Sequence, residues 1–227
     1  MPRIPRLLVS ETSTVYHVMS RTALSGLPFT ATDKDRLQSL IFRYSRIYFT
    51  EILGFCLMDN HFHILVRMLP RDHGDESSLR QRFRLAYGDK AAFSAGKMPE
   101  LRKKWSSLSE FVKEIKQTFS RYYNKQNNRK GYLWGDRFKS VIVQDGRTMV
   151  HCLAYIDLNP IRANMVQRPE DYRWSSMGYH VQTNNRDGAL SMDLGMADWG
   201  IKLRERFQKY QESSMKPGHW TRGKGPH

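Results

Sequence analysis

The feature that most constrains the fold is a pair of apolar runs separated by two turn-forming residues. The runs are residues 51–58 (EILGFCLM) and residues 61–68 (HFHILVRM), and Asp59-Asn60 lies between them. Both runs are rich in β-branched and aromatic residues, and a two-residue connection of this kind is typical of a tight hairpin turn. The sequence therefore predicts an antiparallel β-hairpin here.

The second run of this hairpin carries two histidines. His61 and His63 are two residues apart, so both imidazoles lie on one face of the strand while Phe62 points to the other. Such a pair is either half of a metal site or two polar residues on the solvated side of a sheet. The strand alone leaves both interpretations open.

Helical and extended patterns flank the hairpin. Residues 13–21 alternate as a first strand, and Thr32-Asp33-Lys34-Asp35 predicts the capped start of a helix that runs to about Ile47. Residues 71–105 are polar and basic and indicate a helix plus a loop. Ser107 and Glu110 form a capping box before a helix that ends near Asn127-Asn128. Residues 132–144 indicate a further strand, and Thr148 begins a helix that reaches about Leu158 before Pro160.

This order of elements, β-α-β-β-α-β-α, indicates an α+β domain in which helices flank an antiparallel β-sheet. A ferredoxin-like (split βαβ) arrangement is the expected topology. We predict a domain over residues 1–180, within which 71–105 is a helical or loop insertion. Residues 181–227 form a basic, partly flexible C-terminal extension, with a loose tail around Gly218, Gly223 and Gly225.

The charge distribution favours a polyanion as partner. The chain has 37 Lys and Arg against 22 Asp and Glu, a net charge of +15. Residues 101–140 hold eleven basic and three acidic residues, and residues 201–227 hold seven and two. Rings interleave with these charges, which suits single-stranded nucleic acid because bases stack on rings while cations bind phosphates. The alternative is a charge that only keeps the protein in solution. The rings are Trp105, Tyr122, Tyr123, Tyr132, Trp134 and Phe138.

Other classes of protein fit the sequence less well. No stretch approaches the roughly 18 apolar residues that span a bilayer, and the first residues lack the apolar core of a secretory signal. Cys56 and Cys152 lie in apolar runs and form no disulfide pattern. We therefore expect a cytoplasmic protein without a membrane partner.

A second group of polar residues lies about 90 positions after the histidine pair. His151, Tyr155 and Asn159 are spaced i, i+4, i+8 in HCLAYIDLNPIRAN, so on a continuous helix they share one face. If that face looks toward the hairpin, His61, His63 and the amide oxygen of Asn159 could bind a divalent metal ion beside the Tyr155 phenol.

Both motifs resemble those of the REP-associated tyrosine transposases, relatives of insertion-sequence transposases in the HUH endonuclease superfamily. The resemblance rests on DNHFHILV, FVKEIKQTFSRYYN, GYLWGDRFKS and AYIDLNPIRAN, and it extends over about residues 13–180. His61, Phe62 and His63 match the HUH motif, while Tyr155 and Asn159 match the nucleophile and the third metal ligand. Residues 71–105 look longer than the usual connection, and nothing after about residue 180 matches a family motif.

The resemblance implies a single-stranded DNA endonuclease and strand transferase that acts on hairpin-forming repetitive extragenic palindromes. Tyr155 would form a 5′-phosphotyrosine link and release a 3′-hydroxyl. The expected cofactor is Mg²⁺ or Mn²⁺, although imidazole also accepts Zn²⁺. A monomer that uses its own Tyr155 is favoured over a dimer with shared sites, and the expected cell is bacterial, with the protein at the nucleoid.

Further residues are candidates for supporting roles. His151 could position or deprotonate Tyr155, or simply pack on its helix. Tyr122 and Tyr123 are rival nucleophiles, but they continue the apolar stripe of the 107–126 helix. Trp134 and Trp174 are expected in the core. The candidates for binding DNA are Arg137 and Lys139, in the family-like stretch WGDRFKS, with Arg121, Lys125, Arg129, Lys130 and Arg162.

Two other functions compete with the transposase. One is a DNA-hairpin-binding protein derived from a transposase that no longer cuts, although such a protein has no need of His61, His63, Tyr155 and Asn159 together. The other is a zinc hydrolase built on the H-x-H pair. It lacks the acidic partner that such sites commonly use as general base.

Overall fold

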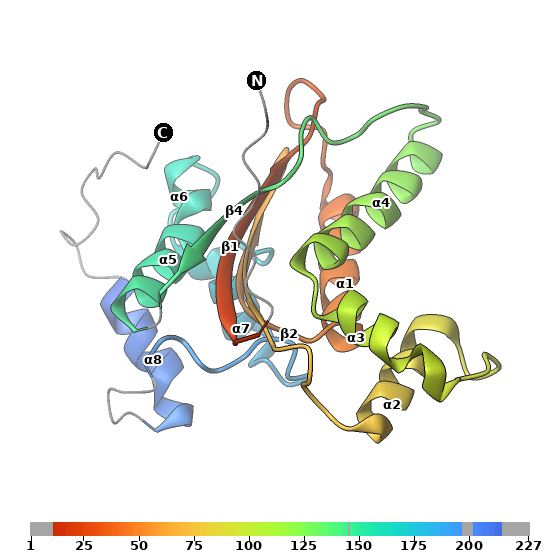
Figure 1. Cartoon of the computed structure of the whole chain (residues 1–227). Helices are drawn as coiled ribbons and strands as arrows, with labels where there is room; N and C mark the ends of the chain where they lie inside the picture. Colours follow the sequence, from red (N-terminus) through yellow and green to blue (C-terminus); the bar gives the residue numbers. More distant parts are fainter. Residues whose placement is uncertain (1–10, 145, 197–201, 215–227) are drawn as a thin grey trace, which may run out of the picture.

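The computed structural model describes residues 11–144, 146–196 and 202–214. At its centre lies a four-stranded sheet in the order β2-β3-β1-β4, in which every neighbouring pair is antiparallel. The sheet and the helices on both its faces confirm the predicted α+β class (Figure 1). The strands are β1 (Thr14–Arg21), β2 (Thr50–Leu57), β3 (His61–Met68) and β4 (Lys139–Val143).

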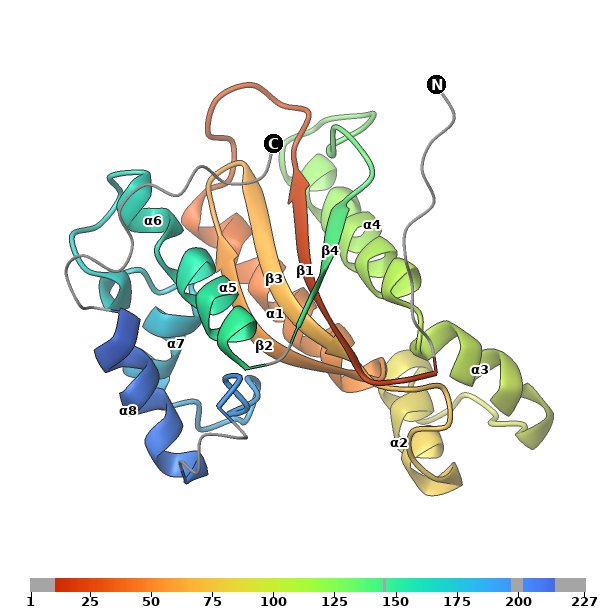
Figure 2. The same cartoon turned by 60° about the vertical axis from the view of Figure 1, so that its left-hand side comes forward.

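Helices cover the sheet on both faces, and each face has its own apolar core (Figures 1 and 2). The larger core lies under α1 (Ala31–Ile47) and α4 (Leu108–Gln126), beyond which are α2 (Glu76–Tyr87) and α3 (Met98–Trp105). The second core lies under α5 (Arg147–Asp157), α7 (Ser176–Thr183) and α8 (Leu203–Ser214). Short turns of helix are α6 (Asn159–Arg162), Ala95–Lys97 and Pro169–Asp171.

The order β1-α1-β2-β3-α4-β4 with this strand arrangement is the predicted ferredoxin-like topology. Helices α2 and α3 lie between β3 and α4, where residues 71–105 were expected to hold a helical insertion. The topology places β1 and β3 side by side in the middle of the sheet. Side chains of these two strands therefore meet on the face that α5 covers.

The predicted hairpin is present, with Asp59-Asn60 at its turn. Strands β2 and β3 pair from Thr50↔Met68 to Leu57↔Phe62, with an irregularity between Ile52 and Gly54. Gly54 lets α5 approach the sheet closely, because a Cβ there would lie 2.5 Å from Leu153 Cδ2. This close approach holds the helix that carries Tyr155 against the strand next to β3.

The two long helices form where their patterns predict them, with one corrected start. The N-cap of α1 is Thr30 rather than Thr32, because Thr30 and Asp33 make a reciprocal capping box. Thr32 lies inside the first turn. Helix α4 begins after Ser107, whose side chain accepts from the Glu110 N–H, and it ends at Gln126 with Asn127 as its C-cap.

One predicted strand is shorter than expected, and the helix after it lies within one residue of its predicted bounds. The strand expected over 132–144 is only Lys139–Val143, because the preceding residues leave the sheet after an isolated bridge between Thr22 and Trp134. The helix expected to run from Thr148 to about Leu158 is Arg147–Asp157, and Asn159 begins α6 with Pro160 in its first turn. A single residue, Leu158, thus separates Asn159 from α5.

Beyond residue 180 the described chain packs on both cores. Leu190 is buried in the larger core, whereas Leu194 and Met196 are buried in the second core, where Tyr210 of α8 donates to Asp157 Oδ2 at 2.7 Å. A domain boundary at 180 stays a prediction, and the tail expected around Gly218–Gly225 lies outside the described residues. Within the described ranges, no helix has the length and apolar character that crossing a bilayer requires.

Candidate active site

The site is built on one end of β1 and β3, on the face that α5 covers. Residues directly opposite in an antiparallel pair share a face, and β1 and β3 pair Met19 with His63 and Arg21 with His61. His17 is two residues before Met19, so it lies on this face as well. Three imidazoles thus gather on two neighbouring strands, one more than the sequence predicted.

His61 is fixed by the residue before it. The Asn60 amide nitrogen donates to Gly26 O at 3.1 Å, so its Oδ1 is the atom that lies 2.7 Å from His61 Nδ1. Because an amide oxygen only accepts, Nδ1 of His61 carries the proton. The Nε2 atom of His61 is then the unprotonated nitrogen, which is the form that binds a metal ion.

His63 is oriented by His17 in a similar way. His17 Nε2 lies 2.9 Å from His63 Nδ1, and the two rings stack with their centroids 5.1 Å apart. This contact occupies Nδ1 of His63 and leaves its Nε2 for another partner. The ring centroids of His61 and His63 are also 5.1 Å apart, so the two rings of the H-x-H pair lie next to each other.

Burial keeps the three imidazoles neutral. It lowers the pKa of His17 and of His61 to about 4, and Arg21 adds to the effect at His61. The pKa of His63 falls to about 2, first through burial and then through the charges of His17, His61 and Arg162. Neutral rings are good metal ligands, and protons do not compete for them near pH 7.

Tyr155 stands over these rings from α5. Its ring makes edge contacts with His17 and His63, each with centroids 6.1 Å apart, and 41% of the residue is exposed. The Arg162 guanidinium lies 4.7 Å from the centre of the Tyr155 ring and donates to the Tyr155 carbonyl at 2.8 Å. The phenol is therefore both close to the histidines and open to a substrate.

Asn159 lies just beyond the C-cap of α5, at the start of α6. Its amide nitrogen donates to the carbonyls of Tyr155 at 3.0 Å and Ile156 at 3.1 Å. These bonds cap the end of α5 and leave Oδ1 as the atom for a cation. Among the described residues, no cluster of three or more His, Cys, Asp or Glu side chains is arranged to hold a metal ion.

Three cations surround the site. Lys139 of β4 pairs with Met19 of β1, which in turn pairs with His63 of β3. Lys139 therefore lies on the same face of the sheet as His63, two strands away. Arg21 pairs with His61, and Arg162 covers Tyr155. Lys139 and Arg162 were predicted as DNA-binding residues, whereas Arg21 and His17 were missed. Arg21 and His17 lie on the face of the histidine pair because β1 is the neighbour of β3 in the sheet. The sequence does not reveal that pairing.

The other candidates lie elsewhere. His151 is exposed one turn before Tyr155 on α5. Tyr122 and Tyr123 are on α4, across the sheet from the histidines, where Tyr123 is buried and donates to Pro28 O. Trp134 and Trp174, which were expected in the core, are only half-buried: both pack against the larger core, and Trp174 also packs against the second core. Of the remaining basic candidates, Arg121 and Arg137 line a groove beside α4, and Lys125, Arg129 and Lys130 lie at or just past its C-terminal end.

Comparisons with known proteins agree with the resemblance seen in the motifs. Residues 10–75 match a family model described as "Transposase IS200 like", a segment that includes His61 and His63 but ends before Tyr155. A solved structure of a REP-associated tyrosine transposase bound to a REP hairpin matches with a TM-score of 0.55 and 18% identity. The match covers 89% of this chain and 93% of that one. A search of curated proteins gives no match. The structural match thus confirms the fold, and residues 10–75 are similar to the IS200-like transposases.

Proposed function

We propose that this chain, which has the fold of a REP-associated tyrosine transposase, is a metal-dependent endonuclease and strand transferase for single-stranded DNA. Its substrates would be hairpin-forming repeats of the REP type, met in the cytoplasm. The observation that carries the proposal is the contact of the exposed Tyr155 ring with His17 and His63. A phenol open to solvent beside oriented, neutral imidazoles suits nucleophilic attack on a phosphodiester.

The reaction forms one bond to phosphorus and breaks another. Tyr155 Oη attacks the scissile phosphorus, the P–O3′ bond breaks, and the phenol proton leaves to solvent or a nearby base. The DNA end with the 3′-oxygen takes up a proton and becomes a free hydroxyl, while the other end stays linked to Tyr155 through its 5′-phosphate. Because the link keeps a phosphodiester, a 3′-hydroxyl can later attack it and rejoin DNA without an energy source.

The residues fit a divalent metal ion, which would polarise the scissile phosphate. His61 and His63 would hold it through Nε2, because Asn60 and His17 occupy the other ring nitrogens. Oδ1 of Asn159 would be the third protein ligand. Two imidazoles, an amide oxygen and the phosphate of the substrate suit Mg²⁺ or Mn²⁺ with open positions.

The chain's own charges would help to bind the anionic substrate. Arg162 lies against Tyr155, while Arg21 and Lys139 lie on the same sheet face as the histidines. A phosphodiester repels anionic nucleophiles, and fixed cations around the scissile group offset that repulsion. These cations would also hold the phosphates on each side of the scissile bond.

A cleavage assay separates this proposal from the alternatives. Labelled single-stranded hairpin DNA with Mn²⁺ should give a cut product and a protein–DNA adduct on a denaturing gel. Tyr155→Phe should abolish both and leave hairpin binding nearly unchanged, whereas the matched control Tyr122→Phe should keep both. Binding without cutting by the wild type would favour the non-cleaving binder, and stoichiometric, tightly held zinc would favour the hydrolase.

A further inference from the structure

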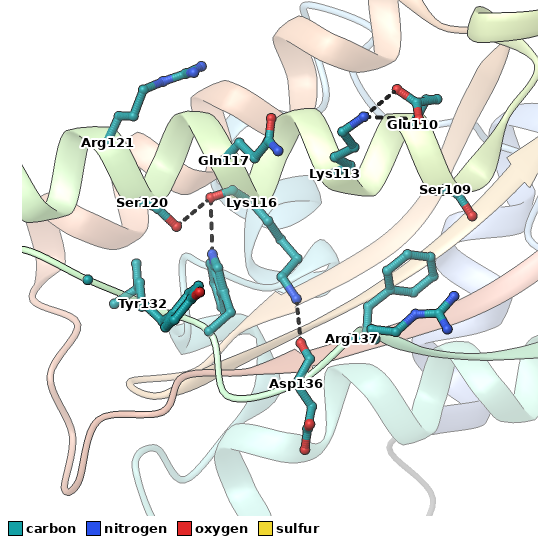
Figure 3. Close-up of a pocket in the computed structure, with 14 residues that line it drawn as sticks. Ser109, Glu110, Lys113, Lys116, Gln117, Ser120, Arg121, Tyr132, Asp136 and Arg137 are labelled. Carbon is teal, nitrogen blue, oxygen red and sulfur yellow. Dashed lines mark hydrogen bonds and ion pairs between the residues drawn. The ribbon is translucent and has the colours of Figure 1, made fainter. Parts of the chain in front are cut away.

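A groove of about 750 Å³ lies between α4 and the segment of residues 131–138 (Figure 3). The helix contributes Lys113, Lys116 and Arg121 to its lining, and the segment contributes Tyr132, Asp136 and Arg137. It lies on the face of the sheet opposite the histidines, since α4 covers the other core. Nothing in the proposed reaction accounts for this groove.

Hydrogen bonds hold the two walls of the groove in place. Lys116 Nζ donates to Asp136 O at 2.9 Å, and Trp134 Nε1 donates back to Lys116 O at 3.0 Å (Figure 3). The Leu133 carbonyl accepts from Ala23 N at 2.8 Å and from Thr22 Oγ1 at 2.6 Å. The segment is thus fixed to the helix and to the residues that follow β1, so the groove is already formed in the free protein.

The charge of the groove is positive. Four cations line it, Lys113, Lys116, Arg121 and Arg137, against two carboxylates. Glu110 is engaged by Lys113 at 3.2 Å, and the Asp136 carboxylate points away from α4 (Figure 3). The excess of positive charge therefore attracts an anionic ligand to the groove.

An exposed ring lies among these charges. Tyr132 is 91% exposed, the highest value among the exposed large apolar and aromatic side chains. Leaving a ring in water forgoes the free energy of burying it, and here no packing role explains its position. A ring that stands beside cations matches the way in which proteins bind unpaired nucleotides, whose bases stack on the ring while phosphates meet the charges.

The groove is also joined to the candidate active site. Gly135 N donates to Arg21 O at 3.1 Å, and the side chain of Arg21 lies on the histidine face opposite His61. Two residues after Arg137 comes Lys139, which faces the same side as His63 at the edge of the sheet. A nucleic-acid strand that crosses this edge would meet Arg137 in the loop before β4 and then Lys139 at the start of β4.

We propose that this groove binds unpaired nucleotides of the DNA strand that leads to the active site, with a base stacked on Tyr132 and phosphates held by Arg137 and the cations of α4. The proposal rests on the proposed function, because it assumes that the substrate is DNA with a single-stranded flank. It assigns an unpaired segment rather than the hairpin stem, since only an unpaired base offers a free face to the ring.

The test measures binding without cutting, in the Tyr155→Phe background. Two fluorescent DNA probes are used, a hairpin with single-stranded flanks and the same hairpin with none. Adding Tyr132→Ala or Arg137→Ala should weaken binding of the flanked hairpin about tenfold and change binding of the bare hairpin less than twofold. Both side chains are exposed, so the variants should fold normally.

Matched controls come from a distant helix. Tyr87→Ala and Arg84→Ala remove an exposed ring and an exposed cation of α2, and neither should change binding of either probe. A photo-crosslink from 5-iodouracil placed in the flank should map to Tyr132 by mass spectrometry. Equal losses for both probes, or no loss with Tyr132→Ala, would overturn the proposal.

The outcome is separable from that of the proposed function. If wild-type protein forms the Tyr155 adduct but the Tyr132 variant binds normally, the groove proposal falls and the enzyme stands. If the Tyr132 variant loses the flanked hairpin while wild-type protein forms no adduct, the groove proposal stands and the enzyme falls.

Discussion

At the scale of single residues, the site depends on side chains that set the orientation of others. Asn60 bonds to Gly26 O and His61 Nδ1, and His17 bonds to His63 Nδ1. Each contact occupies Nδ1, so Nε2 is the nitrogen through which the ring would bind a ligand. Partners of this kind commonly change metal affinity by 10–100-fold when they are removed, because the ligand loses its tautomer and orientation.

Replacing Asn60 should therefore weaken metal binding without removing a ligand. Asn60→Ala is expected to lower the affinity for Mn²⁺ about tenfold, as measured by titration calorimetry in the absence of DNA. Asn60→Asp keeps an acceptor for His61 Nδ1 and should retain more of the affinity. Equal affinities for the wild type and Asn60→Ala would contradict the assigned role.

The sequence predicted some of these residues and missed others for a clear reason. The spacing of His61 and His63 guarantees a shared face once the strand is assigned. The nearness of His17 depends on the register between β1 and β3, which only the folded sheet sets. Asn60 was seen only as a turn residue, because its bond to the Gly26 carbonyl joins positions 34 residues apart.

At the scale of elements, α5 is anchored on the side away from Tyr155. Asp157 is fully buried, and it accepts from Ser176 Oγ at 2.7 Å, Met177 N at 3.0 Å and Tyr210 Oη at 2.7 Å. These bonds tie α5 to α7 and α8. Burial raises the pKa of Asp157 to about 6, although the hydrogen bonds act in the opposite direction.

This raised pKa gives a pH dependence with a definite sign. In the unfolded chain Asp157 ionises near 3.8, so its contribution to stability is fully present below that pH and is lost as the pH rises through about 6. The loss amounts to roughly 3 kcal/mol. In urea unfolding, the stability of the wild type relative to Asp157→Asn should fall between pH 4 and pH 7. A difference that does not vary with pH would show that Asp157 titrates normally.

Gly178 fixes how closely α7 approaches the chain before it. A Cβ at this position would overlap the backbone carbonyl of Tyr172, which cannot move as a flexible side chain does. We expect Gly178→Ala to lower the free energy of unfolding by about 1–3 kcal/mol. Gly96→Ala, at a position with room for a Cβ, should change it by less than about 0.5 kcal/mol. Similar urea midpoints for the two variants would refute this.

Elements with strong local patterns were the predictable part of the fold. The hairpin and α4 follow from alternation and from a long apolar stripe, which are properties of nearby residues. Residues 132–138 also look like a strand, but hydrogen bonds to α4 and to the end of β1 hold them in a loop. Likewise, α5 ends before Pro160 and a new short helix begins at Asn159. The i, i+4 spacing of the residues does not predict how the chain turns between the two helices.

At the scale of the whole molecule, the candidate site is complete within one chain. Tyr155 contacts His17 and His63 of its own sheet, and Asp157 and Gly54 hold α5 in that position. A dimer with exchanged helices would instead place each tyrosine on the histidines of its partner. We therefore propose that a monomer is the active form.

Mixing two inactive variants tests this arrangement. Tyr155→Phe supplies intact histidines and His63→Ala supplies an intact tyrosine, so a shared site would regain activity in the mixture. We expect no regain of cleavage at any mixing ratio, with wild-type protein diluted to the same concentration as the control. Cleavage restored to about a quarter of the wild-type rate or more would show that helices are exchanged.

The most direct measurement of the central claim is the identity of the residue that becomes linked to DNA. Wild-type protein is incubated with a hairpin substrate and Mn²⁺, digested with trypsin and nuclease, and analysed by mass spectrometry. We predict a 5′-phosphonucleotide on the peptide that contains Tyr155, and none in His63→Ala. A modification on Tyr122 or Tyr123, or cleavage with no protein adduct, would contradict the account.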